Sequence, residues 1–69
     1  MEQMLHVRFE GKSFDISLAE LDIGSGSSDR QVKTVLAAYL DVAESRFRNY
    51  VVEHHENGNM TVRPEAVFG

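Results

Sequence analysis

Apolar and polar residues alternate along the first part of the chain. Six apolar residues occupy every second position on either side of a glycine: Leu5, Val7, Phe9, Phe14, Ile16 and Leu18. A period of two is typical of strands with one buried face, so this segment predicts a β-hairpin. A two-residue turn at Gly11 and Lys12 pairs Phe9 with Phe14, and glycine at its first position suits a type II′ turn. In this register Arg8 lies opposite Asp15 on the outer face.

The middle of the chain predicts a helix from Ser28 to Asp41. Ser28 and Gln31 form the S-x-x-Q pattern of a capping box. Apolar residues then follow at helical spacing and define one stripe: Val32, Val35, Leu36, Tyr39 and Leu40. The opposite side carries Lys33, Thr34 and Ala37. A second capping box over 41–44 predicts a short helical turn that brings Phe47 inward.

Two registers compete for the third apolar stretch, which leads through an Asn-Gly pair into a last strand. A two-residue turn at Asn57 and Gly58 pairs Glu53 with Val62, which mixes polar and apolar residues on one face. A three-residue loop over 56–58, with Gly58 left-handed, gives cleaner faces and is preferred. The core side then holds Tyr50, Val52, His54, Met60 and Val62, and the outer side holds Val51, Glu53, His55, Thr61 and Arg63. Pro64, which has no N–H to donate, ends the ladder or lies at an edge.

Two hairpins joined by a helix predict an α+β domain with one sheet and the helix on its apolar face. A right-handed crossover makes the first and last strands parallel neighbours, so the expected strand order is 2-1-4-3. This arrangement resembles the β-grasp, or ubiquitin-like, architecture. The resemblance rests on the hairpin Leu5–Leu18, the helix Ser28–Asp41, the strands Tyr50–His54 and Met60–Val62, and a chain that ends in Gly69.

The composition fits a single small domain over 1–69, with 64–69 as a C-terminal tail. An apolar share of 42% is enough for a real core, and the absence of cysteine removes disulfides and thiolate zinc sites. Seven Lys and Arg against eleven Asp and Glu give a net charge of −4, which opposes binding to nucleic acid. No secretory signal and no membrane-spanning segment is recognised, so the cytoplasm is the default location and no membrane is expected as a partner.

The candidate chemistry does not indicate an enzyme, a metal site or a cofactor. His54 and His55 are adjacent in a strand and point to opposite faces, so they cannot share a metal ion. His6 and His55 lie on the same face but on strands separated by the last strand, about 9–10 Å apart. His54 is expected to be partly buried near the hairpin tip. Acid pairs such as Glu53 and Glu56 come without the cleft that acid–base catalysis requires.

The C-terminus suggests an alternative function. Similarity to ubiquitin-like modifiers and to small sulphur carriers implies activation of a C-terminal carboxylate, here that of Gly69. Those proteins end in Gly-Gly, whereas Phe68 occupies the penultimate position here. Val67 and Phe68 either fold back on the core or sheet edge, or bind a partner.

The leading hypothesis is a non-catalytic ubiquitin-like module that acts through contact with another protein. Its candidate partner surface comprises His6, Arg8, His55, Arg63, Val67 and Phe68. The alternatives are a carrier or modifier activated at Gly69, and a structural subunit that forms homo-oligomers through an edge strand.

Overall fold

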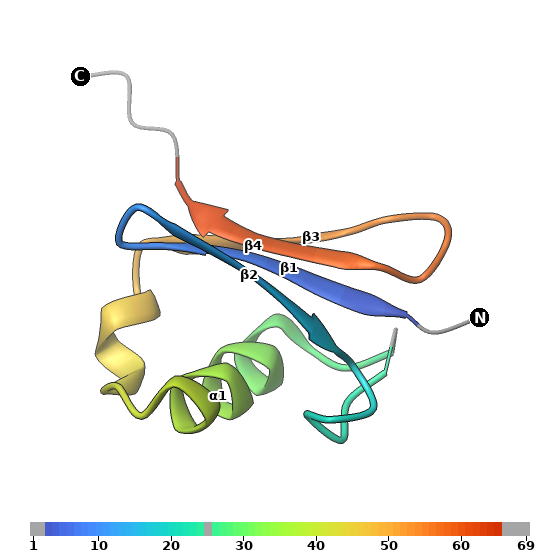
Figure 1. The fold of residues 1–69 in the computed structure, drawn as a ribbon, viewed down its shortest axis with the longest axis horizontal. Helices are drawn as coiled ribbons and strands as arrows, with labels where there is room; N and C mark the ends of the chain where they lie inside the picture. The colour runs from blue at the N-terminus through green and yellow to red at the C-terminus, as the bar shows by residue number, and fades with distance from the viewer. Residues whose placement is uncertain (1–2, 25, 66–69) are drawn as a thin grey trace.

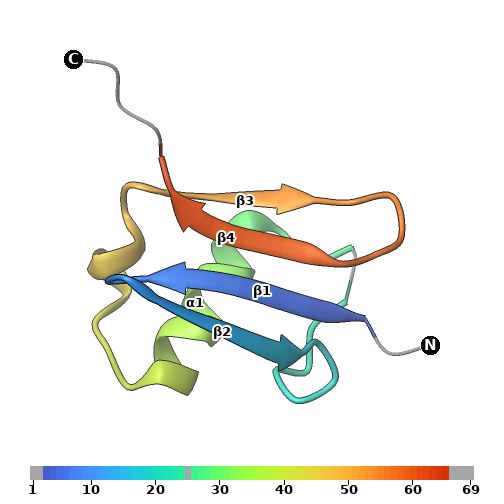
Figure 2. The same ribbon diagram turned by 45° about the horizontal axis from the view of Figure 1, so that its top comes forward.

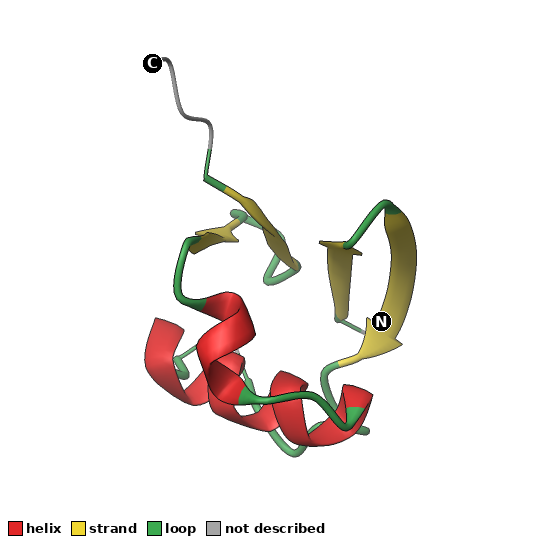
Figure 3. Ribbon diagram, turned by 90° about the vertical axis from the view of Figure 1, so that its left-hand side faces the viewer, coloured by secondary structure: helices red, strands yellow, loops and turns green. Residues whose placement is uncertain are grey.

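The described residues form a mixed sheet with helical segments packed on one of its faces. In the computed structural model these residues are 3–24 and 26–65. The elements follow in the order β1 (Met4–Phe9), β2 (Lys12–Ser17), α1 (Asp29–Leu40), the 3₁₀ helix η1 (Glu44–Phe47), β3 (Tyr50–His54) and β4 (Met60–Pro64). Figure 1 shows α1 and η1 below the strands, and Figure 3 shows this two-layer arrangement from the side.

The strand order is the one expected from the order of elements. The sheet runs β2-β1-β4-β3, and the four strands lie side by side in Figure 2. The central strands β1 and β4 are parallel, with Leu5, His6 and Val7 aligned with Met60, Thr61 and Val62. The outer pairs are antiparallel hairpins. The α+β class and the 2-1-4-3 order are therefore confirmed.

The register of the first hairpin differs from the prediction by two residues. Val7 lies opposite Phe14 and Phe9 lies opposite Lys12, so the turn residues are Glu10 and Gly11. Both have positive φ, 51° and 78°, as a type I′ turn requires. The twist of this turn matches that of the flanking strands, which offsets the cost of a left-handed Glu10. A two-residue shift preserves the faces, so the predicted apolar face still lies toward the core.

The second hairpin has the preferred register. Val52 lies opposite Val62 and His54 opposite Met60. The His55 N–H donates to the Asn59 carbonyl at 2.9 Å, which closes a loop over 56–58, and Gly58 has a φ of 90°. Strand β4 ends at Pro64, opposite Tyr50, but proline does not interrupt the hydrogen bonds to β3: the next N–H, that of Glu65, donates to the Asn49 carbonyl at 2.8 Å.

The helix has the predicted boundaries, but its buried stripe is rotated. The Ser28 hydroxyl accepts the Gln31 N–H at 3.1 Å, and Asp41 ends the helix in the left-handed conformation with a φ of 57°. Val32, Leu36 and Ala37 are buried, whereas Tyr39 is 51% exposed. The prediction was wrong for Ala37, which is 3% exposed, and for Tyr39, because α1 is covered by η1 as well as by the sheet.

The short helical turn after α1 brings Phe47 into the core. Phe47 is fully buried, its ring stacks on Phe9 at 4.8 Å between ring centres, and it meets Tyr50 edge-on at 5.1 Å. The predicted second capping box is wrong, because Asp41 terminates α1 and Ala43 precedes η1 without a side-chain cap.

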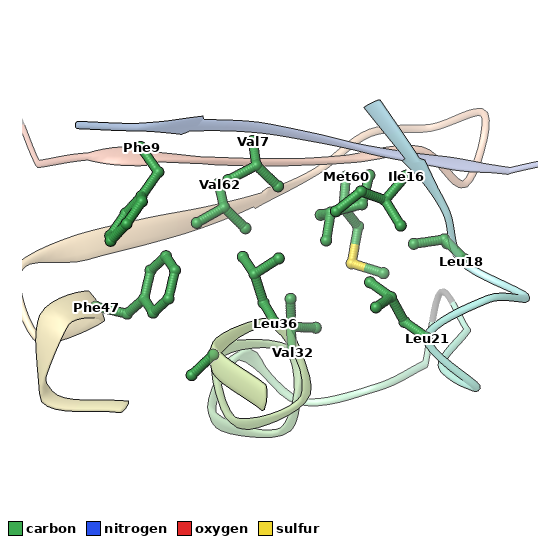
Figure 4. Packing of buried hydrophobic residues seen from close by; sticks show 12 residues of the cluster. Val7, Phe9, Ile16, Leu18, Leu21, Val32, Leu36, Phe47, Met60 and Val62 are labelled. Atoms are coloured by element: carbon green, nitrogen blue, oxygen red, sulfur yellow. The ribbon is translucent and has the colours of Figure 1, made fainter. Parts of the chain in front are cut away.

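One continuous core lies between the layers. Figure 4 shows the inward side chains of the sheet facing those of α1 and η1. It contains Leu5, Val7, Phe9, Ile16, Leu18, Leu21, Val32, Leu36, Ala37, Phe47, Met60 and Val62, and no buried polar residue occurs in the described ranges.

Candidate functional site

The outer face of the sheet holds the sequence-predicted partner residues that the structure describes. Because Leu5, Val7 and Phe9 are buried, the intervening His6 and Arg8 point away from the helices, and both are exposed. Arg63 of β4 and His55, which directly follows β3, lie on the same side. No described segment covers this face, since α1 and η1 lie against the other one (Figure 3).

The two histidines on this face are each held by a side chain of a neighbouring strand. His6 Nδ1 lies 2.7 Å from Asp15 Oδ1, and His55 Nε2 lies 2.8 Å from Thr61 Oγ1. Asp15 is directly opposite His6 in the β1–β2 ladder, so the contact is a cross-strand pair. These hydrogen bonds restrict the rotamers of the imidazole rings.

Arg63 and Glu53 form a two-pronged ion pair across β4 and β3. Arg63 Nε donates to Glu53 Oε1 at 2.9 Å, and Nη2 donates to Oε2 at 3.4 Å. The hydrogen bond from Arg63 lowers the pKa of Glu53 below its ordinary value of 4.5, and the same bond raises the pKa of Arg63. Each charged form therefore stabilises the other, although both side chains remain more than 40% exposed, which limits the energy involved.

Among the described residues, Arg8 is a cation of the outer face without a partner of opposite charge. It lies opposite Ser13, and within 3–24 and 26–65 it has no ion-pair partner. A guanidinium with unoccupied donors beside fixed polar groups is suited to an approaching carboxylate or carbonyl oxygen.

The third histidine faces the other way. His54 Nε2 lies 2.8 Å from Asp29 Oδ1 at the start of α1, whereas His55 points outward, so the two adjacent rings lie on opposite faces as predicted. His54 is exposed rather than partly buried, because it lies at the end of β3 beyond the edge of the core. Among the described residues, no three His, Asp or Glu side chains lie close enough to hold a metal ion.

The partners that orient these residues were harder to predict than the residues themselves. The predicted register assigned Asp15 to Arg8, but Asp15 pairs with His6. Only the turn type distinguishes these registers, since both keep the apolar face intact. Arg63 and Glu53 could have been paired from the second hairpin, because opposite charges on one face at diagonal positions are a recognisable signal.

Part of the predicted surface lies outside the described residues. Val67, Phe68 and the carrier-type Gly69 all follow Glu65, the last described position. Glu65 itself donates its N–H to the Asn49 carbonyl at 2.8 Å.

Comparison with known proteins identifies no relative. No family model matches the chain, and neither a curated protein nor a solved structure matches it. Within the described ranges, neither helix has both the length and the apolar character needed to cross a bilayer.

Proposed function

We propose that this chain is a small, non-catalytic module of the ubiquitin-like, or β-grasp, type that binds another protein through the outer face of its sheet. The 2-1-4-3 order, the parallel central pair and the single α-helix between two hairpins in the described ranges support the architectural part of the proposal. The observation that carries the functional part is the outer face itself, which no described segment covers and whose polar side chains are already oriented by cross-strand contacts.

Prior orientation matters because binding must immobilise side chains. Each rotamer-rich side chain that becomes fixed costs about 0.5–1.5 kcal/mol. Arg63, His6 and His55 are already restrained in the free protein, so a partner that meets them loses less entropy. Arg8 has free N–H donors, so it can form a charge-assisted hydrogen bond with an acceptor on the partner.

The size of the face limits the area that a partner can bury on it. Four strands at the usual spacing are about 14 Å from first to last, and a six-residue strand is about 20 Å long. The resulting flat area of about 300 Å² is well below the roughly 800 Å² that a partner buries in a standard stable complex. We therefore expect a weak, transient complex. Such a complex is detected by covalent crosslinking rather than by affinity purification with washing steps.

Photo-crosslinking tests the proposal. A photoreactive benzophenone amino acid at position 51, on the outer side of β3 and opposite Arg63, is expected to label a specific protein in a lysate of the source cells. Arg8→Glu and His55→Glu should each abolish that product, because each places a negative charge on the labelled face. Lys12→Glu makes a matched change of an exposed cation at the hairpin tip and should leave the product intact.

The captured protein is then purified and titrated calorimetrically against the wild type and the same three variants. Loss of binding in the Arg8 and His55 variants, with retention in the Lys12 variant, supports the proposal. Equal labelling in all variants, or no saturable binding in the titration, contradicts it.

A further inference from the structure

A second surface, on the helical side of the domain, has a charge opposite to that of the chain as a whole. A groove of about 470 Å³ lies between α1 and η1. It is lined by Arg30, Lys33, Glu44, Ser45, Phe47 and Arg48. The lining thus carries three cationic side chains and one carboxylate, in a chain whose net charge is −4.

The three cations of this groove have no intramolecular partner in the described part of the chain. Arg46 is neutralised by an ion pair with Glu10 and Arg63 by one with Glu53, whereas Arg30, Lys33 and Arg48 enter none. The groove's carboxylate, Glu44, forms no ion pair in the described ranges and accepts a hydrogen bond from the Thr34 hydroxyl at 2.7 Å; its charge leaves the lining with two positive charges in excess. The groove therefore presents unpaired positive charge.

The backbone fixes the spacing of these charges. Arg30 and Lys33 are three residues apart on α1, which places them on neighbouring turns of one helix face, about 4.5 Å apart along the axis. Arg48 directly follows η1 on the other side of the groove. Phe47, fully buried against Phe9 and Tyr50, anchors η1 and so keeps the two sides together.

We propose that this groove binds an acidic peptide segment of a partner protein. Two positive charges in excess suit two carboxylates, and the long apolar stems of arginine and lysine can cover the peptide between them. A nucleic acid is the weaker candidate, because a polyanion extending beyond the groove meets the field of a net-negative domain. The groove is on the opposite side of the sheet from Arg8 and His55, so binding here goes beyond the outer-face interaction and does not depend on it.

Fluorescence anisotropy with a defined probe tests the groove. The probe is a short fluorescein-labelled peptide of alternating glutamate and glycine, titrated with the intact chain at low ionic strength. The expected result is saturable binding that weakens as salt is added, and no binding of the matched glutamine peptide. Lys33→Glu combined with Arg48→Glu should raise the Kd by about tenfold or more, since two attractive contacts become repulsive.

A control variant separates local recognition from overall charge. Lys12→Glu reverses an exposed cation at the hairpin tip, away from the groove, and should change the Kd by about twofold or less at moderate salt. A circular dichroism melt confirms that the double variant is folded. The double variant should also retain the outer-face crosslink at position 51, so failure at one surface is distinguishable from failure at the other.

Several results overturn the proposal. These are absence of saturable binding to the glutamate peptide, an equal loss of affinity in the Lys12→Glu control, and unchanged affinity in the folded double variant. Tighter binding of an oligothymidylate with the same number of charges would replace the peptide with a nucleic acid as the occupant.

Discussion

At the scale of single residues, the ion pair between Glu53 and Arg63 makes the stability of the folded protein depend on pH. The hydrogen bond from Arg63 lowers the pKa of Glu53 in the folded protein, whereas the unfolded chain retains the ordinary value of 4.5. A lowered folded-state pKa contributes stability above the unfolded value and loses it as the pH falls through the folded value. The contribution of Glu53 is therefore present near neutrality and disappears on acidification below about 4.5.

This predicts a pH-dependent effect for Glu53→Gln. The wild type should be more stable than the variant at neutral pH, and the difference in free energy of unfolding should shrink as the pH is lowered below 4.5. Urea unfolding across this range measures the difference. In an Arg63→Gln background the same substitution should lose most of its pH dependence, because the main cause of the lowered pKa is gone and only the weaker attraction of His55 remains. A difference that stays constant with pH would contradict the assignment.

At the scale of elements, the first hairpin depends on a left-handed residue that is not glycine. Glu10 has a φ of 51° in the type I′ turn, a conformation that asparagine tolerates better than longer side chains. Glu10 also forms an ion pair with Arg46, whose guanidinium carbon lies 5.7 Å from the centre of the Phe9 ring. A substitution at this position therefore changes both the backbone strain and the pair.

Comparison of Glu10→Asn with Glu10→Gln isolates the backbone contribution. Both variants lose the charge, but only asparagine relieves the strain, so Glu10→Asn should be more stable than Glu10→Gln by about 0.5–1 kcal/mol. Equilibrium urea unfolding of the two variants gives this difference. Gly11→Ala is the converse control: its φ is 78° and a methyl group meets no atom within 4 Å, so any loss of stability comes from the backbone alone. Equal stability of the asparagine and glutamine variants would argue against the type I′ turn.

The same hairpin shows which parts of the fold can be predicted from the pattern. Alternation determines which residues face the core, and it did so correctly for both hairpins. It leaves registers that differ by two residues equivalent, because each keeps the same face buried. The choice between them depends on the twist of the turn. In the second hairpin Gly58, with a positive φ, indicated where the turn lies. In the first hairpin the residue with positive φ is Glu10, a residue type that does not indicate a left-handed conformation.

Helical periodicity has a similar limit. It placed Leu36 at the centre of the buried stripe, but it excluded Ala37 and included Tyr39. The periodicity of apolar residues indicates the stripe that faces the sheet, but it does not reveal that η1 also packs against α1. The groove was missed for a related reason: Arg30, Lys33 and Arg48 are scattered in sequence and converge only when η1 folds back beside α1.

At the scale of the whole molecule, the two hairpins share one core. They meet at the parallel pair of β1 and β4, where three residues of each strand are aligned. Leu36 of α1 is fully buried beneath them, together with Leu5 and Met60 from the two strands. A helix that packs under both hairpins couples them, so we expect the described fold to unfold as one cooperative unit.

Two probes of urea unfolding test this cooperativity. Far-ultraviolet circular dichroism follows the helix and sheet together, and in a Tyr39→Ala variant the remaining tyrosine fluorescence comes from Tyr50 of β3. The two transitions should have the same midpoint. Leu36→Ala, which removes a fully buried side chain, should cost about 2–5 kcal/mol and lower both midpoints together. Tyr39→Ala should cost much less, since that side chain is half-exposed. A Tyr50 signal that changes at lower urea than the circular dichroism would show instead that the second hairpin unfolds independently of the first.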